Sequence, residues 1–128
     1  MARVGTSAGT CTFKMYGGCI TGGRASGAAI AGNLVLEQGS TSWLYGGLIT
    51  GGSNDKGAGN VMLKNGAQLI LDGGSITAGT GLLAGNVYIK EKCSLSAIAG
   101  SIIGGTVYVE GTITLGDGAV VEQIEYAQ

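Results

Sequence analysis

The sequence contains no histidine and no proline among its 128 residues. Without histidine, the chain lacks the side chain that most often serves as a general base near neutral pH and as a metal ligand. The three cysteines (Cys11, Cys19 and Cys93) show no C-x-x-C spacing, so a zinc site is not expected. We expect them to be small buried or half-exposed residues, and we expect no metal and no other cofactor.

Charge is also scarce, because only 12% of the residues are charged and the net charge is −1. A balance this close to neutral gives no electrostatic basis for binding nucleic acid or an anionic membrane surface. No apolar run reaches the length of a transmembrane helix, and no signal peptide is visible in MARVGTSAGT at residues 1–10. We therefore expect neither a nucleic-acid partner nor a membrane partner.

Glycine and apolar residues are abundant instead, with 27 glycines and 45% hydrophobic residues. The glycines follow no collagen-like period, and valine, isoleucine and leucine occur throughout, unlike in a disordered glycine-rich tract. These features indicate a folded chain that turns every few residues.

Two phrases repeat along the chain in alternation. The first phrase is TFKMYGGCITGG, and it recurs in progressively altered form at 12–23, 41–52, 68–79 and 94–105. The second is GNLVLEQG, which recurs at 32–39, 59–66, 85–92 and 105–111. Each repeat holds three short segments in which apolar residues alternate, a pattern typical of β-strands.

Strands this short bury an apolar face only when successive repeats stack on one another, as they do in a solenoid. We therefore predict an all-β fold, a right-handed parallel β-helix of about four to five coils, with 26–29 residues and three short strands per coil. The solenoid is expected at 12–115, with an N-terminal cap or junction at 1–11 and a C-terminal cap at 116–128.

Alignment of the repeats predicts five apolar core columns. They are Phe13, Ser42, Leu69, Leu95 and Ile113; Met15, Leu44, Leu71, Ala97 and Leu115; Ile20, Ile49, Ile76 and Ile102; Leu34, Val61, Val87 and Val107; and Leu36, Leu63, Ile89 and Val109. Asn33, Asn60 and Asn86 are expected to stack at one corner, since asparagine tolerates turn geometry and can form hydrogen bonds along a stack.

One corner takes insertions, RASGAAIA at 24–31, SNDKGA at 53–58 and TGLLA at 80–84. We interpret them as tolerated surface loops, and a ligand-binding edge is the alternative.

Strand alternation leaves two apolar stripes facing outward, and contiguous exposed apolar residues usually mark an interface. The first comprises Val35, Met62, Tyr88 and Tyr108. We predict that it contacts other subunits in a homo-oligomer or a larger protein assembly, because loops of five to eight residues look short for covering it. The second is a candidate ligand face, with aromatic stacking on a glycan as its expected mode, and comprises Lys14, Tyr16, Trp43, Tyr45 and Ile70.

The phrases FKMYGGCITGG and WLYGGLITGG, followed by GNVxL, resemble the F-x-M-x-G-G-T-I-T/S-G coils of large right-handed β-helix surface proteins from gut Firmicutes and related bacteria. Similar coils occur in fibres and decoration proteins of their phages. The resemblance covers residues 12–111 and implies an adhesin-like or structural solenoid that is extracellular, on a cell surface or in a virion. The chain shows no export signal or wall anchor and stops after four or five coils, which favours the virion.

Catalysis is not expected, although β-helices also include carbohydrate-active enzymes. A lyase or glycosidase needs grouped carboxylates, whereas Asp72 stands alone in its outward column, where we expect it between Tyr45 and Ile98. The outward column of Glu37, Lys64, Lys90 and Glu110 is interpreted as a solvated face. Ice binding is a further alternative, but the threonine column of Thr21, Thr50 and Thr77 ends at Ile103. We expect a non-catalytic structural β-solenoid, with a phage fibre or decoration protein or a glycan-binding adhesin module as the alternative.

Overall fold

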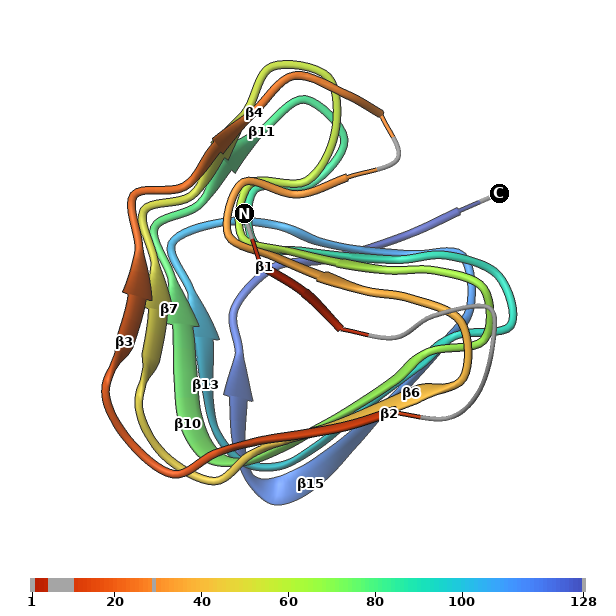
Figure 1. Cartoon of the computed structure of the whole chain (residues 1–128). Coiled ribbons are helices and arrows are strands. Elements are labelled where there is room, and N and C mark those ends of the chain that lie inside the picture. The colour runs from red at the N-terminus through yellow and green to blue at the C-terminus, as the bar shows by residue number, and fades with distance from the viewer. Residues whose placement is uncertain (1, 5–10, 29, 128) are drawn as a thin grey trace.

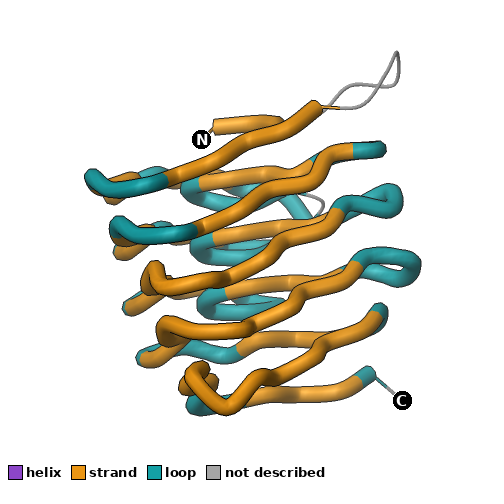
Figure 2. Tube along the Cα trace, turned by 90° about the horizontal axis from the view of Figure 1, so that it is seen from below, coloured by secondary structure: helices purple, strands orange, loops and turns teal. Residues whose placement is uncertain are grey.

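The chain folds as a stack of parallel strands, in a computed structural model that describes residues 2–4, 11–28 and 30–127. Figure 1 looks along the stack and shows the coils lying almost on top of one another around a three-sided body. Figure 2 shows the same coils from the side, one above the next, with the N and C ends at opposite ends of the stack. The described residues form no helix, and all strand pairs are parallel. The predicted parallel β-helix is confirmed.

The strands of the described residues form three sheets. The six-stranded sheet contains, in spatial order, β1 (Ala2–Val4), β5 (Leu34–Leu36), β9 (Val61–Leu63), β12 (Val87–Ile89), β14 (Val107–Val109) and β16 (Ile124–Tyr126). The seven-stranded sheet contains β2 (Cys11–Met15), β3 (Cys19–Thr21), β6 (Ser40–Leu44), β7 (Leu48–Thr50), β10 (Gln68–Thr77), β13 (Ser94–Ile103) and β15 (Thr112–Val121). The three-stranded sheet contains β4 (Arg24–Ala25), β8 (Ser53–Asn54) and β11 (Thr80–Gly81).

The number of strands per coil varies around the expected three, which only the third coil has, with β10, β11 and β12, among the described residues. In the first two coils the Tyr-Gly-Gly corner separates two strands, and Gly18 and Gly47 adopt φ values of 83° and 87°, which glycine reaches without steric cost. From β10 onward a single ten-residue strand bends through the same corner. The insertions add the two-residue strands β4, β8 and β11. The fourth coil has no insertion, and its step from Ser94 to Thr112 is 18 residues (112 − 94), shorter than expected.

The five predicted columns form the main core, except that the predicted member Leu115 is 49% exposed and lies outside it. Strand registers place their members directly above one another, as in the series Ile20, Ile49, Ile76 and Ile102. Ile76 is completely buried between Ile49 and Ile102, as expected for the middle of a stack. The single polar member, Ser42, is also buried, and its hydroxyl is the one buried side-chain polar atom without a hydrogen-bond partner among the described residues.

An asparagine ladder fixes the corner between the insertions and the six-stranded sheet. Asn33 Nδ2 donates to Asn60 Oδ1 over 2.8 Å, and Asn60 Nδ2 donates to Asn86 Oδ1 over 2.8 Å. Each amide also donates to a backbone carbonyl 17 residues later, at the end of a strand of the next coil, as Asn60 does to Thr77. Each side-chain oxygen accepts from a glycine N–H, as that of Asn60 does from Gly52 at 2.9 Å. The predicted asparagine stack is confirmed, and its polar groups are satisfied inside the protein.

The expected caps differ from the observed structure. Residues 116–121 belong to β15 and residues 124–126 form β16, and both strands pair in parallel with the coil before them. The C-terminal segment therefore extends the solenoid by another coil and does not lie across it. At the other end β1 extends the six-stranded sheet by pairing with β5, whereas residues 5–10 lie outside the described residues.

Candidate functional site

The predicted interface column is covered by the chain itself. Val35 and Met62 are 0% exposed and Tyr88 is 6% exposed, and Tyr108 is half-buried beside them. These side chains do point away from the main core, but they enter a second, smaller core. The prediction that the column lies on an outer face is wrong, so a contact between subunits through these side chains is not available in this fold.

The insertions provide the cover. Ala31, Ala58 and Ala84 pack against the column, and parallel bridges join Ala31 to Ala58 and Ala58 to Ala84. The short side chains let the three loops stack closely on one another and on the sheet. Figure 1 shows this lobe, with β4 and β11, projecting beside the three-sided body. Asn54 anchors the lobe, because its buried amide donates to the carbonyls of Gly27 and Ile30, each over 2.8 Å.

Tyr88 and Tyr108 close this second core at its rim. Their rings meet edge to face, with centroids 5.1 Å apart. The Tyr88 hydroxyl donates to Glu110 Oε2 over 2.5 Å. Burial raises the pKa of the Tyr88 phenol, and the hydrogen bond to Glu110 raises it further. The aromatic pair is therefore fixed inside the molecule, with its polar tip satisfied by a neighbouring carboxylate.

The candidate ligand face is exposed and its residues are brought together. Lys14, Trp43 and Ile70 occupy one register position on β2, β6 and β10. Lys14 Nζ lies 5.6 Å from the centre of the Trp43 ring, within the range of a cation–π contact. Lys14 is exposed, whereas Trp43 and Ile70 are half-buried.

Two tyrosines continue this face at the adjoining corner. The rings of Tyr16 and Tyr45 are stacked, with centroids 5.2 Å apart and an angle of 13° between their planes. Tyr16 is 71% exposed and Tyr45 is 36% exposed. Tyr16 and Tyr45 directly follow β2 and β6, two residues beyond Lys14 and Trp43, so continued alternation puts all four side chains on the same side. We call Lys14, Tyr16, Trp43, Tyr45 and Ile70 the aromatic face.

The chemistry of the aromatic face is that of a binding surface. Flat rings held by a β-sheet offer apolar contact area at little conformational cost, and their hydroxyl, indole N–H and ammonium groups supply hydrogen-bond donors. Asp72 follows Leu71, the partner of Leu44, at this corner. It pairs with Ala99 rather than Ile98, because a bulge shifts the register there, so the expected alignment with Ile98 is wrong.

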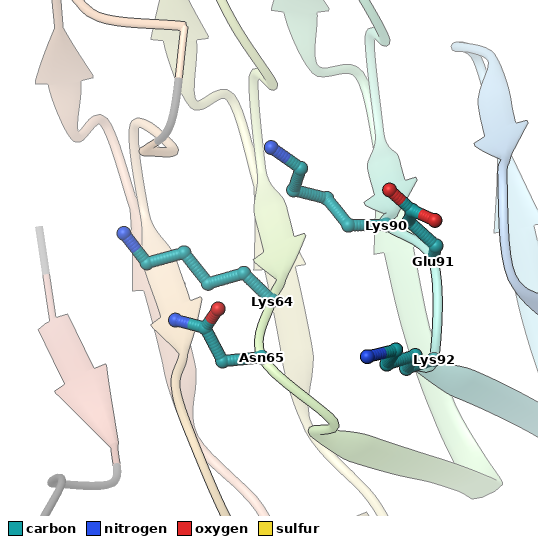
Figure 3. A pocket seen from close by; sticks show the side chains of 5 residues that line it. All are labelled: Lys64, Asn65, Lys90, Glu91 and Lys92. Atoms are coloured by element: carbon teal, nitrogen blue, oxygen red, sulfur yellow. The ribbon is translucent and has the colours of Figure 1, made fainter.

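A hollow at another corner is lined by lysines from two neighbouring coils. Figure 3 shows Lys64 and Lys90 extending in the same direction, with Asn65, Glu91 and Lys92 beside them. Lys64 Nζ forms an ion pair with Glu37 Oε1 at 3.5 Å. This ion pair agrees with the interpretation of Glu37 and Lys64 as part of a solvated face. Glu37 and Glu91 accompany the three lysines at this corner, so the positive charge there is partly balanced. The sequence alignment did not single out Asn65, Glu91 or Lys92.

The described residues offer no group of side chains for a metal ion. No set of three or more histidine, cysteine, aspartate or glutamate side chains in that part of the chain is placed to hold a metal ion. Cys11, Cys19 and Cys93 are free thiols, and burial raises the pKa of the Cys93 thiol despite backbone hydrogen bonds and Lys90, which act in the opposite direction. Thr50 and Thr77 join their hydroxyls over 2.9 Å, and the column continues to Ile103 as expected.

Comparisons with protein-family models, with curated proteins and with solved structures found no significant match. In the described part of the chain there is no helix long and apolar enough to cross a membrane.

Proposed function

We propose that this chain is a non-catalytic structural β-solenoid of a bacterial cell surface or a virion, and that it adheres to a glycan through the aromatic face. The observation that carries the proposal is the exposed stack of Tyr16 and Tyr45 beside the Lys14–Trp43 contact. The other stripe, formed by Val35, Met62, Tyr88 and Tyr108, is covered by the chain itself, which leaves the aromatic face as the accessible one of the two predicted stripes.

A saccharide suits this surface better than a flat protein partner does. Sugar rings present C–H groups on one face and hydroxyls at the edge, which matches apolar rings surrounded by hydrogen-bond donors. The face is small, since it spans β2, β6 and β10, so it fits a few sugar units. The surrounding sheet holds the rings in place before binding, which reduces the entropy lost when a ligand binds.

The non-catalytic part of the proposal rests on the arrangement of the acidic groups. Asp72 is the carboxylate nearest this corner along the strand, and no ion pair or hydrogen bond joins it to a second acid or to a base in the described residues. Hydrolysis or elimination of a glycosidic bond requires two such groups across the substrate. A ligand on the aromatic face is therefore held and not cleaved.

A glycan array followed by fluorescence titration tests the proposal. Trp43 is the single tryptophan, so its emission reports on the aromatic face alone. Binding of an array hit should change this emission, and the double substitution Tyr16→Ala, Tyr45→Ala should weaken binding at least about tenfold, the loss of roughly 1.4 kcal/mol of stacking. The bound glycan should be recovered intact after prolonged incubation.

The matched control is Tyr126→Ala, which removes a tyrosine that is also exposed but lies on the six-stranded sheet. It should bind like the parent chain. The proposal is wrong if the parent chain binds no glycan on the array, or if the double variant and the Tyr126 variant bind equally well.

A further inference from the structure

Among the described residues, the six-stranded sheet ends in two edge strands that match each other in register. In this part of the chain β1 pairs with β5 and β16 pairs with β14, and neither strand has a second pairing, so they lie at opposite ends of the stack. Figure 2 shows the opposite positions of the two ends. Both strands are three residues long and run parallel to the strands between them. Each edge strand has no backbone pairing on its outer side within the described residues. Natural edge strands need some means of controlling what pairs with them.

One register column of this sheet begins with a base and ends with an acid. The column passes through Arg3, Val35, Met62, Tyr88, Tyr108 and Glu125. Repetition of the same coil register would place Glu125 opposite Arg3 of a second copy. The flanking positions would place Ile124 opposite Ala2 and Tyr126 opposite Val4. Opposite charges at facing positions of paired strands stabilise the pair, and like charges destabilise it.

The two ends of the sequence also differ in charge, with the basic residues at the end that contains Arg3 and the acidic residues at the end that contains Glu125. Residues 1–36 contain three basic residues and no acidic residue, namely Arg3, Lys14 and Arg24. Residues 93–128 contain four acidic residues and no basic residue, namely Glu110, Asp117, Glu122 and Glu125. The arrangement attracts unlike ends and repels like ends when two copies meet.

We propose that copies of this chain associate head to tail, with β16 of one copy adding in parallel to β1 of the next. The six-stranded sheet then continues from copy to copy, as in recognition by strand addition. The contact is heterologous, because two different surfaces meet, so it produces open chains of copies rather than a closed dimer. The inference is independent of glycan binding, which uses other strands.

The joint involves one sheet only, and this limits its strength. β2 belongs to the coil after β1, so it lies one strand spacing further from the joint and does not reach β15 of the preceding copy. Two three-residue strands bury less area than a standard protein interface. We expect a weak association that becomes visible at protein concentrations of roughly 0.1–1 mM and low salt.

Light scattering behind size exclusion, over that concentration range, tests the proposal. The parent chain should increase in mean mass with concentration and lose most of this increase at about 0.5 M salt, where ionic attraction is screened. Glu125→Arg and Arg3→Glu should each be monomeric with an unchanged far-UV spectrum. The matched control, Asp117→Arg, makes the same charge change at an exposed position of β15 and should still associate.

Exchanging the charges of residues 3 and 125 tests the pairing of these two residues most directly. A one-to-one mixture of the Glu125→Arg and Arg3→Glu chains should associate, because each end of one variant then meets an unlike end of the other. The chain carrying both substitutions should associate by itself. A parent that remains monomeric at 1 mM in low salt, a Glu125→Arg chain that associates alone, or a mixture that stays monomeric would each overturn the proposal.

Discussion

At the scale of single residues, the buried polar groups explain which positions of a β-solenoid core tolerate polarity. Asn33, Asn60 and Asn86 are buried, and each of them uses both ends of its amide in hydrogen bonds. Ser42 occupies a core column between Phe13 and Leu69 and finds no partner for its hydroxyl among the described residues. A buried hydroxyl without a hydrogen bond costs free energy that an apolar side chain would not.

Substitution of this serine should therefore stabilise the protein. Ser42→Ala should increase the free energy of unfolding by about 1 kcal/mol, since it removes an unsatisfied group and leaves the packing nearly unchanged. Urea denaturation followed by circular dichroism measures the change. Ser40→Ala is the control, because the Ser40 hydroxyl donates to the Glu37 carbonyl over 2.7 Å and its loss should destabilise the chain. Equal effects of the two substitutions would contradict this explanation.

At the scale of the elements, the insertions have a different role from the one that their sequence suggests. The prediction weighed each loop by its own length and found it short for covering a side chain such as Met62. The loops act together, because each covers one side chain of its own coil and its neighbours cover the next ones. In the sequence, an alanine precedes each Gly-Asn pair (Ala31, Ala58 and Ala84). This recurrent small residue was the sequence feature that could have indicated that the loops stack on one another and cover the column.

The covered column gives a direct prediction for the elements. Met62→Lys should destabilise the protein by several kcal/mol or prevent folding, because the ammonium group would be buried without a partner. Thermal unfolding measures the change. The control Ile98→Lys places the same charge at an outward bulge where the side chain is about half exposed, and should change stability by less than about 0.5 kcal/mol. A soluble Met62→Lys chain with the midpoint of the parent would show that the insertions do not cover this column.

At the scale of the whole molecule, the repeat determines most of the architecture. Stacking of the same alternating segments accounts for the parallel strands and for a core in which Ile76 lies between Ile49 and Ile102. Alternation also identified the residues of the aromatic face. It could not reveal the bulge at Ile98, nor that residues 116–126 continue the coils, because both depend on backbone register at corners where the repeated phrases are altered.

The central claim is that successive coils lie directly above one another in this register. Nuclear Overhauser measurements between isoleucine methyl groups test it most directly, since residues of one column are about 4.8 Å apart from coil to coil. The methyl groups of Ile76 should show strong cross-peaks to those of both Ile49 and Ile102, and those of Ile49 should show none to Ile102. Cross-peaks from Ile76 to neither residue, or to only one, would contradict the stacked solenoid.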